Sequence, residues 1–123
     1  MTTYKDDAKY KLKNVLPTVM DTTVNDIPEV FKDDCQKIIL YGSCARGDYT
    51  DDSDVDIAIL TKSDREQVKK YNAQIYDIAA KIGIATMAIV NFVCLPISEF
   101  EEKKTWYPYF MNIAKDGVLL YER

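Results

Sequence analysis

Apolar side chains near the N-terminus recur at every third or fourth position, a spacing typical of one face of a helix. The repeating positions are Leu12, Val15, Leu16, Val19 and Met20. This pattern predicts an N-terminal helical segment over about residues 1–34, which Pro17 should kink or split. Residues 37–42, KIILYG, then form an apolar run that ends in glycine, and such a run predicts a buried strand.

Residues 54–60, DVDIAIL, predict a second strand whose two faces differ. Because successive side chains of a strand point in opposite directions, Asp54, Asp56 and Ala58 fall on one face. The other face is apolar and carries Val55, Ile57 and Ile59. We therefore expect this strand to bury one face while it holds two carboxylates side by side on the other.

An S-x-x-E capping box at Ser63 and Glu66 predicts that a helix begins there. Apolar positions continue at helical spacing through Val68, Tyr71, Ile75, Ile78 and Ile82. Gly83 is expected to end this helix as its C′ residue. Residues 84–95, IATMAIVNFVCL, are apolar on both faces and rich in β-branched side chains, which predicts a central strand.

The C-terminal part of the chain predicts further elements. A second S-x-x-E pattern, at Ser98 and Glu101, indicates a short helix, and residues 112–123, NIAKDGVLLYER, indicate a helix end, a glycine turn and a last strand. The element order is α, β, β, α, β, α, β, without repeats or linkers. We expect one domain over residues 1–123, with its core from about residue 36, in the α/β or α+β class with helices flanking a small mixed sheet.

Composition limits the partners and the compartment. The 123 residues carry a net charge of −4, so we expect no broad basic face and no direct nucleic-acid binding. The lack of histidine excludes His-based triads and imidazole bases, and three cysteines without a CxxC pair favour a reducing compartment. The charged N-terminus is unlike a secretory signal, and no run reaches the roughly 20 apolar residues of a membrane-spanning helix. We expect a soluble, cytoplasmic protein without membrane contact.

Two short motifs carry the candidate chemistry. Asp54 and Asp56 share a strand face with Cα atoms about 6.6 Å apart, two rises of roughly 3.3 Å. A divalent cation removes their mutual repulsion, roughly 1 kcal/mol in water and more when partly buried, and the spacing suits two metal ions roughly 3.5–4 Å apart. Upstream, Gly42 permits close backbone approach, and Ser43 offers a hydroxyl and an amide to phosphate oxygens. Together the motifs predict a nucleoside triphosphate held between a glycine-serine turn and carboxylate-bound magnesium.

Residues 42–60, GSCARGDYTDDSDVDIAIL, resemble the signature of the DNA polymerase β-type nucleotidyltransferase superfamily. That signature places Gly and then Ser or Gly about ten residues before Asp, an apolar residue and a second acidic residue. Here ten residues separate Ser43 from Asp54. The patterns GSxARG at 42–47 and SDxD at 53–56 resemble the minimal nucleotidyltransferases of bacteria and archaea, and the resemblance extends from about residue 36 to the C-terminus. It implies the polymerase β-type nucleotidyltransferase fold.

The resemblance also implies an activity: transfer of a nucleoside monophosphate from a triphosphate, with ATP the leading expectation, to an acceptor hydroxyl. Asp54 and Asp56 would be the catalytic residues and would hold Mg²⁺, with two ions expected. Nucleotide binding would fall to Gly42, Ser43, Arg46 and Ser53. Arg46 has two interpretations, since it can face the phosphates or pair with a neighbouring aspartate and fix the loop.

The chain departs from the superfamily pattern at one position. Active members carry a third carboxylate on a later strand, where it helps to deprotonate the attacking hydroxyl. No Asp or Glu occurs between Asp77 and Glu99, and Asn91 is the strongly polar residue in the middle of the expected strand. An amide can contact a metal through its oxygen but cannot take a proton. Asn91 is therefore the possible third-carboxylate position, and a phenolic acceptor, with a pKa of about 10, tolerates the loss best.

The resemblance implies a protein partner as well. The chain is short for a second, acceptor-recognising domain, so the acceptor should come from another polypeptide or from a second copy in a homo-oligomer. The resemblance to antitoxins of HEPN and minimal nucleotidyltransferase pairs makes a small helical HEPN-type toxin the leading candidate. The alternative is a catalytically degenerate module that binds only nucleotide or partner. Small-molecule nucleotidylation is disfavoured by the length.

Three local features have a plain interpretation beside a functional one. We expect Asp51 and Asp52 to form a solvated turn, and Cys44 to be an inert thiol because no histidine base is present. The aromatic run at 105–113, TWYPYFMNI, can dock a partner, but packing of the C-terminal helix on the sheet is favoured.

Overall fold

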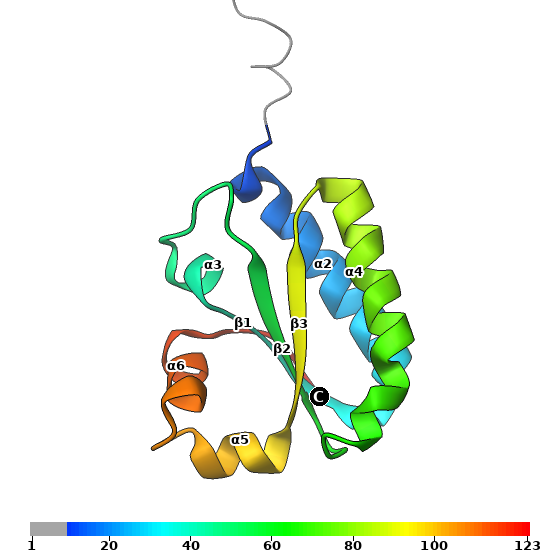
Figure 1. The fold of residues 1–123 in the computed structure, drawn as a ribbon, viewed down its shortest axis with the longest axis vertical. Helices are drawn as coiled ribbons and strands as arrows, with labels where there is room; N and C mark the ends of the chain where they lie inside the picture. The colour runs from blue at the N-terminus through cyan, green and yellow to red at the C-terminus, as the bar shows by residue number, and fades with distance from the viewer. Residues whose placement is uncertain (1–9) are drawn as a thin grey trace, which may run out of the picture.

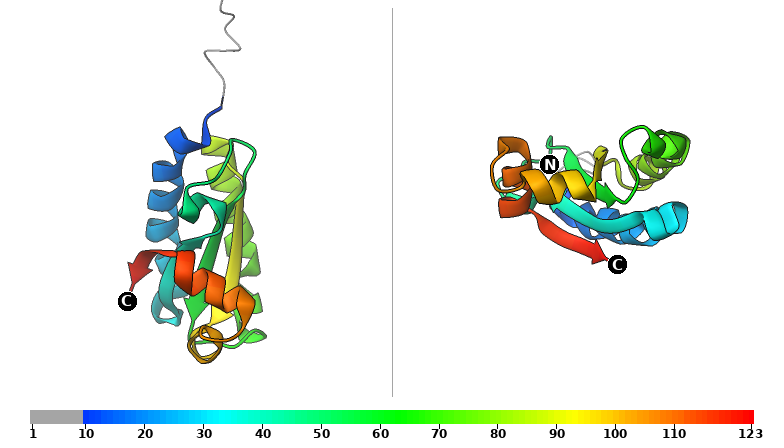
Figure 2. Two further views of the ribbon diagram at one scale, coloured as in Figure 1. Left: turned by 90° about the vertical axis from the view of Figure 1, so that its left-hand side faces the viewer. Right: turned by 90° about the horizontal axis from the view of Figure 1, so that it is seen from below.

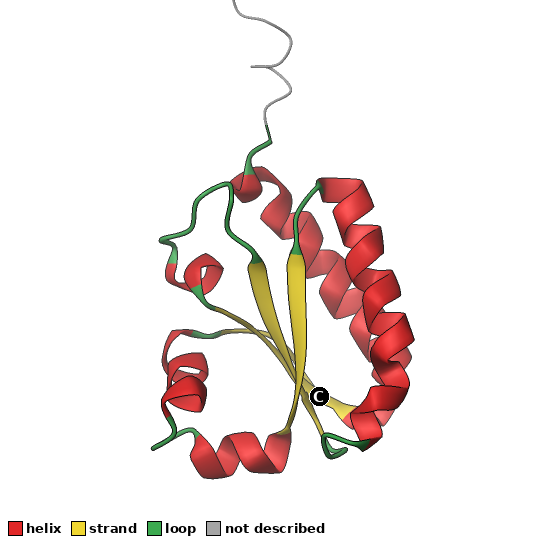
Figure 3. Ribbon diagram, in the orientation of Figure 1, coloured by secondary structure: helices red, strands yellow, loops and turns green. Residues whose placement is uncertain are grey.

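A four-stranded mixed sheet lies between two layers of helices (Figures 1 and 3). The computed structural model describes residues 10–123, so the predicted helical residues before Tyr10 lie outside the described part. The strands are β1 (Cys35–Tyr41), β2 (Val55–Thr61), β3 (Val90–Pro96) and β4 (Val118–Glu122), in the spatial order β3-β2-β1-β4. Strand β1 is antiparallel to β2 and β4, and β2 is parallel to β3. The expected mixed sheet is therefore confirmed.

The helices cover both faces of the sheet. They are α2 (Leu12–Phe31), α3 (Ser43–Arg46), α4 (Asn72–Thr86), α5 (Ile97–Lys103) and α6 (Pro108–Asp116), with short 3-10 helices η1 (Lys32–Asp34) and η2 (Gln67–Tyr71). Helices α2 and α4 cover one face, and α5 and α6 cover the other, as Figure 2 shows. The single turn α3 follows β1 and leads into the loop before β2. None of the helices described here is long and apolar enough to cross a membrane.

Strand β2 has the two faces that its sequence predicts. Val55, Ile57 and Ile59 are buried in the core under α2 and α4. Ala58 and Leu60 are buried on the opposite side, under α5 and α6. Since side chains alternate, the carboxylate of the partly buried Asp56 projects on the α5/α6 side, just beyond the part of the sheet that these helices cover.

The structure differs from the predicted context of one helix and one strand. Helix α2 is not split at Pro17, because it runs unbroken for 20 residues. Burial of its inner face against the sheet compensates for the lost hydrogen bond, since Leu12, Val19 and Ile27 are fully buried. Strand β3 is an edge strand rather than a central one. It is apolar on both faces because both faces are covered: Phe92 packs on the α2/α4 side and Leu95 on the α5/α6 side.

The helix after β2 begins and ends later than predicted. The capping box lies one residue further on: the amides of Glu66 and Gln67 donate to Asp64 Oδ1 at 3.0 and 2.8 Å, and Gln67 Oε1 accepts from the Asp64 amide at 3.0 Å. The Ser63 hydroxyl instead donates to Asp34 Oδ2 at 2.6 Å. Gly83 lies within α4, which continues to Thr86 and ends where Met87 adopts a left-handed φ of 68°.

The C-terminal elements follow the prediction closely. Helix α5 begins at Ile97, one residue before Ser98, and α6 ends at Asp116 before the glycine turn and β4. In the aromatic run, Phe110 and Ile113 are buried in the core, as the favoured interpretation expects. The other large side chains of this run, Trp106, Tyr107, Tyr109 and Met111, are exposed.

Candidate active site

The turn at Gly42 brings the first motif against the second. Strand β1 ends at Tyr41, which pairs with Asp56 across the antiparallel ladder. Gly42 has a φ of +74°, and a Cβ at this position would lie 2.7 Å from Asp56 Oδ2. Both the left-handed backbone and the close carboxylate therefore require glycine. As a result, the Asp56 carboxylate lies directly against the backbone from which α3 begins.

Asn91 completes a three-residue cluster with the paired aspartates. It lies opposite Asp56 in the parallel pairing of β2 with β3. Its amide Nδ2 donates to Asp54 Oδ2 at 3.1 Å and to Asp56 Oδ1 at 3.3 Å. One amide thus bridges both carboxylates and offsets part of their repulsion. Asp54 and Asn91 are exposed and Asp56 is partly buried, so the cluster is open to solvent.

The donor set of this cluster fits a hard divalent cation. Two carboxylates and an amide oxygen are among the ligands that Mg²⁺ accepts, with water and phosphate oxygens filling its remaining positions. Rotation of the Asn91 amide about its last bond would exchange its nitrogen for its oxygen at the same place. Within residues 10–123, no group of three or more His, Cys, Asp or Glu side chains gathers as a metal site. The amide is therefore the third side chain available beside the pair.

The two carboxylates that flank β3 in the sequence, Asp77 and Glu99, lie on helices rather than on the strand. Asp77 lies on α4, on a different element from the pair. Glu99 lies on α5, and its Oε1 is 2.7 Å from an Arg65 nitrogen and 3.2 Å from Lys103 Nζ. Hydrogen bonds from Arg65 lower the pKa of Glu99 against the opposing effect of burial. Glu99 is thus a structural ion-pair partner.

Helix α3 presents its first backbone amides at the turn. The amides of Ala45 and Arg46 both donate to the Gly42 carbonyl at 3.1 Å. The two preceding N–H groups, those of Ser43 and Cys44, have no carbonyl within the helix to bond, as at any helix start. They are the groups that can meet phosphate oxygens beside the carboxylates.

The Cys44 thiol in this turn is buried and hydrogen-bonded. Its Sγ donates to the Asp54 carbonyl at 3.6 Å. Burial, together with the carboxylates of Asp56 and Asp54, raises the pKa of the thiol. The thiol therefore stays protonated at neutral pH, which agrees with the expected inert role.

Arg46 and Ser53 make contacts within the loop between the motifs. Arg46 Nε donates to Asp48 Oδ2 at 3.2 Å, and a second guanidinium nitrogen lies 3.9 Å from Asp116 Oδ2. The structure thus shows the second interpretation of Arg46, pairing with neighbouring aspartates. Ser53 Oγ accepts from the Thr50 amide at 2.9 Å and so closes a turn immediately before Asp54. Nucleotide binding by Arg46 and Ser53 stays a prediction.

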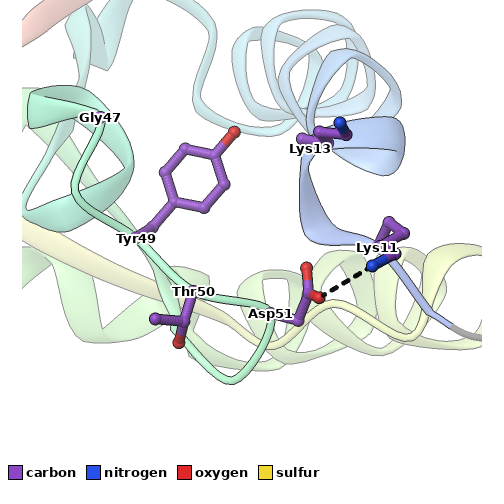
Figure 4. A pocket seen from close by; sticks show the side chains of 6 residues that line it. All are labelled: Lys11, Lys13, Gly47, Tyr49, Thr50 and Asp51. Atoms are coloured by element: carbon purple, nitrogen blue, oxygen red, sulfur yellow. Dashed lines mark ion pairs between the residues drawn. The ribbon is translucent and has the colours of Figure 1, made fainter.

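The loop is also anchored to a distant helix through Asp51, as Figure 4 shows in part. The Leu12 amide, at the start of α2, donates to Asp51 Oδ1 at 3.0 Å, and Lys11 Nζ lies 4.0 Å from Asp51 Oδ2. The expectation of a simple solvated turn is therefore wrong for Asp51, because its carboxylate caps α2. The same segments line a cavity of about 580 Å³, formed by Lys11, Lys13, Gly47, Tyr49, Thr50 and Asp51. This cavity lies beside the loop and does not include the paired carboxylates.

Sequence reasoning missed two tyrosines beside the site. The hydroxyls of Tyr41 and Tyr109 lie 3.1 Å apart, linking the end of β1 to α6. Burial, then the hydrogen bond with Tyr109, raises the pKa of Tyr41. Tyr41 immediately precedes Gly42, so antiparallel pairing of the two predicted strands could have placed it opposite Asp56. Nothing in the sequence indicates its contact with Tyr109.

Residues 24–117 match a family model described as the nucleotidyltransferase domain. Over 98 residues, 80% of this chain and 90% of the relative, the sequence is 32% identical to a protein of Methanocaldococcus jannaschii named as a candidate protein adenylyltransferase.

Two solved structures share the fold. One is a toxin-antitoxin with AMP-PNP, with a TM-score of 0.56 and 21% identity over 87% of this chain and 73% of the other. Another is the tri-AMPylated HEPN toxin of Shewanella oneidensis in complex with an MNT antitoxin, with a TM-score of 0.54 and 18% identity over 87% of this chain and 72% of the other. The mixed sheet flanked by helices matches theirs, as the sequence resemblance implies.

Proposed function

The chain belongs to the nucleotidyltransferase domain family, and from that premise we propose that it transfers AMP from ATP to a hydroxyl of a protein partner. The observation that carries this proposal is the cluster formed by Asp54, Asp56 and the Gly42 turn. Asp56 is in contact with the position where a Cβ of residue 42 would lie, so the phosphate-binding and cation-binding groups are adjacent. In this proposal the phosphates of the substrate and its cation are therefore bound by two adjacent groups of the protein.

Each part of the cluster has a role in the proposal. Asp54 and Asp56 would hold Mg²⁺, and Asn91 could offer its amide oxygen as a further ligand. The amides of Ser43 and Cys44 receive the β- and γ-phosphates at the start of α3. When bound, magnesium would neutralise the negative charge that develops on the α-phosphate and on the leaving pyrophosphate. In the reaction, the acceptor oxygen bonds to the α-phosphorus as the bond from that phosphorus to the bridging oxygen breaks.

Asn91 favours a particular class of acceptor. It contacts both aspartates but cannot take the proton that the attacking hydroxyl must lose. A tyrosine, with a pKa of about 10, loses that proton more readily than an aliphatic alcohol and needs the least help from a base. We infer that the acceptor is a phenol and that its proton leaves to water or to a phosphate oxygen.

The comparisons support a partner of the toxin type. One of the similar solved structures is a complex of an AMPylated HEPN toxin with an MNT antitoxin. We propose a small helical HEPN-type protein as the acceptor, with this chain as its cytoplasmic antitoxin. A second candidate function is a binding module without turnover, which the amide in place of the third carboxylate favours.

The two candidates differ in whether label from ATP reaches the partner. The purified chain is incubated with magnesium, ATP labelled at the α-phosphate, and the HEPN-type protein encoded beside it. We expect label on the partner, and its loss with Asp54→Asn and with Asp56→Asn. Asp52→Asn is the matched control, because it makes the same charge change at an exposed side chain in the turn that precedes Asp54. A stable complex that leaves ATP intact would instead identify the binding module.

A further inference from the structure

Helix α4 carries apolar side chains on two opposite sides. Its inner side is buried against the core through Ile78, Ile82 and Thr86. Its outer side carries a second apolar row at spacings of three and four, which we call the α4 stripe: Ala73, Tyr76, Ala80, Ile84 and Met87. At 100° per residue, this row lies opposite the buried one. An ordinary surface helix would carry polar side chains there.

The large members of the α4 stripe are almost fully solvent-exposed. Tyr76 is 75% exposed, Ile84 87% and Met87 74%. Helix α4 packs on α2 and β3 and lies at the outer edge of the molecule in Figure 1, so no other described element covers its outer side. Isolated exposed apolar side chains are common, but a contiguous row is a mark of an interaction surface.

The exposed aromatic residues of the α5–α6 corner differ from this stripe. Trp106 packs edge-on against Tyr107, and Tyr107 packs in the same way against Phe110. The Lys103 ammonium lies 5.3 Å from the centre of the Tyr107 ring. These side chains pack on one another and are 58% or less exposed, whereas the large side chains of the α4 stripe are at least 74% exposed. The stripe is therefore the stronger candidate for a docking surface.

The C-terminal end of the α4 stripe is joined to the candidate active site by a short segment of chain. Met87 terminates α4, and Ile89, itself 62% exposed, follows it by two residues. The Ile89 carbonyl accepts from the Val55 amide at 2.8 Å, and Val55 stands between the two aspartates. Asn91 follows two residues later and contacts both carboxylates. Because α4 covers the face of the sheet opposite to Asp56, a partner on the stripe reaches the carboxylates by passing over the end of the edge strand β3 where Asn91 lies.

The spacing and size of the α4 stripe fit an α-helix. The small Ala73 and Ala80 alternate with large side chains and leave grooves into which the ridges of another helix can pack. The stripe covers fourteen residue steps, about 21 Å of helix at roughly 1.5 Å per residue. Tyr76 also borders a cavity of about 280 Å³ between α4 and the edge strand β3, which can receive one anchoring side chain.

The apolar area of the stripe suits the centre of a protein interface. The exposed large side chains are those of Tyr76, Ile84, Met87 and Ile89, with areas of roughly 150–250 Å² each. With the exposed fractions given above, they present apolar surface on the order of 500 Å². A standard interface buries about 800 Å² per partner, of which the rim is polar. Asp77 and Lys81 flank the stripe, and Lys81 is already paired with Asp26 at 2.8 Å. Binding of a partner to the α4 stripe should therefore depend on burial of apolar surface rather than on ion pairs.

We infer that the α4 stripe docks a helix of the protein acceptor and thereby delivers the acceptor hydroxyl to Asp54 and Asp56. This inference rests on the proposed function for the identity of the partner. It adds the surface through which a single small domain holds a macromolecular acceptor. A second copy of this chain is the competing occupant, and the test distinguishes the two.

The test measures association separately from chemistry. Tyr76→Glu and Ile84→Glu are introduced together into the Asp54→Asn protein, and binding of the HEPN-type protein encoded beside the chain is measured by calorimetry. We expect at least tenfold weaker binding than with Asp54→Asn alone. Met111→Glu is the matched control, since Met111 is also an exposed apolar residue, 41% exposed on α6, and it should bind as before. Ile84→Glu alone is used if the double variant melts at a lower temperature.

Each result of this experiment either supports or overturns the docking of a partner helix on the α4 stripe. Unchanged binding by the stripe variants overturns it, whether or not AMP is transferred. Failure of the unmodified chain to bind this protein overturns it as well. A stripe variant that converts the chain alone from dimer to monomer in sedimentation assigns the stripe to a second copy and overturns it. Stripe-dependent binding without AMP transfer supports the docking surface while refuting the proposed transfer.

Discussion

Substitution of Gly42 by alanine separates backbone strain from damage to the candidate site. The backbone of Gly42, with φ +74° and ψ −156°, lies in a region essentially restricted to glycine and costs an alanine about 1–3 kcal/mol, and the new Cβ would lie 2.7 Å from Asp56 Oδ2. That oxygen must retreat to at least 3.4 Å, an ordinary contact. A terminal carboxylate can do so by rotating its side chain. The collision should therefore alter the site more than it alters the free energy of unfolding.

Gly47→Ala is the control for this experiment. Gly47 has a φ of +87°, and a Cβ there would meet nothing within 4 Å. Gly47→Ala should lose about 1–2 kcal/mol of unfolding free energy in urea, because it places alanine in the left-handed helical region. Gly42→Ala should lose about 1–3 kcal/mol from its backbone conformation, in which glycine is strongly favoured. Nucleotidyl transfer should fall on the order of 100-fold with Gly42→Ala, since a displacement of about 1 Å in a catalytic group has effects of that size. With Gly47→Ala, transfer should be nearly unchanged.

The two measurements together can refute the reasoning. If Gly42→Ala transfers AMP as well as Gly47→Ala does, the contact with Asp56 has no role in the chemistry. If Gly42→Ala is several kcal/mol less stable than the control, Asp56 cannot move aside and the collision is a folding defect. Adding Asp56→Ala to Gly42→Ala removes the collision, so it should restore the part of the lost stability that the collision causes and leave the backbone cost of about 1–3 kcal/mol.

Three further predictions concern other parts of the fold. Asn91→Asp should raise transfer by an order of magnitude or more, because it supplies a base beside both aspartates; initial rates with an intact circular dichroism spectrum test this, and an unchanged rate would show that another group takes the proton. Asp51→Ala should cost about 1 kcal/mol by removing the cap of α2; urea unfolding with Asp52→Ala as control measures it, and equal stability of the two would contradict the cap. Burial acts to raise the pKa of Asp34, but hydrogen bonds from Ser63 and Tyr71 outweigh it and lower the pKa. Its contribution to stability is therefore present above the unfolded pKa of about 4 and is lost as pH falls through the lower folded pKa. Asp34→Asn should flatten that acid-side loss in melting curves, and an unflattened curve would assign the loss to other carboxylates.

The sequence predicts the parts of the fold that depend on local periodicity. Alternation along residues 54–60 correctly assigns each side chain of β2 to its face, and so the shared face of Asp54 and Asp56. The placement of Asn91 beside the pair is expected from the family resemblance rather than from periodicity, and the parallel register of β2 and β3 puts it opposite Asp56. These features depend on spacing within one strand or between two adjacent strands.

Features that depend on contacts between distant residues could not be predicted. Asp51 caps a helix that begins 39 residues earlier, so no local pattern distinguishes it from Asp52. Ser63 fits a capping box in sequence, but its hydroxyl bonds Asp34, 29 residues away, and the box forms one residue later. The approach of Asp56 to Gly42 also needs the pairing of two strands, which the residue types alone do not specify.

The cap formed by Asp51 changes the meaning of the ten-residue spacing between Ser43 and Asp54. Because its middle is fixed to the start of α2, this connection behaves as two short loops rather than one long one. Residues 48–50 only join α3 to the anchor, so an insertion there adds little loop-closure entropy and leaves the carboxylates in place. Residues 52 and 53 join the anchor to Asp54 through the turn closed by Ser53, and an insertion there displaces the strand start. Tolerance to changes in length should therefore differ sharply on the two sides of Asp51.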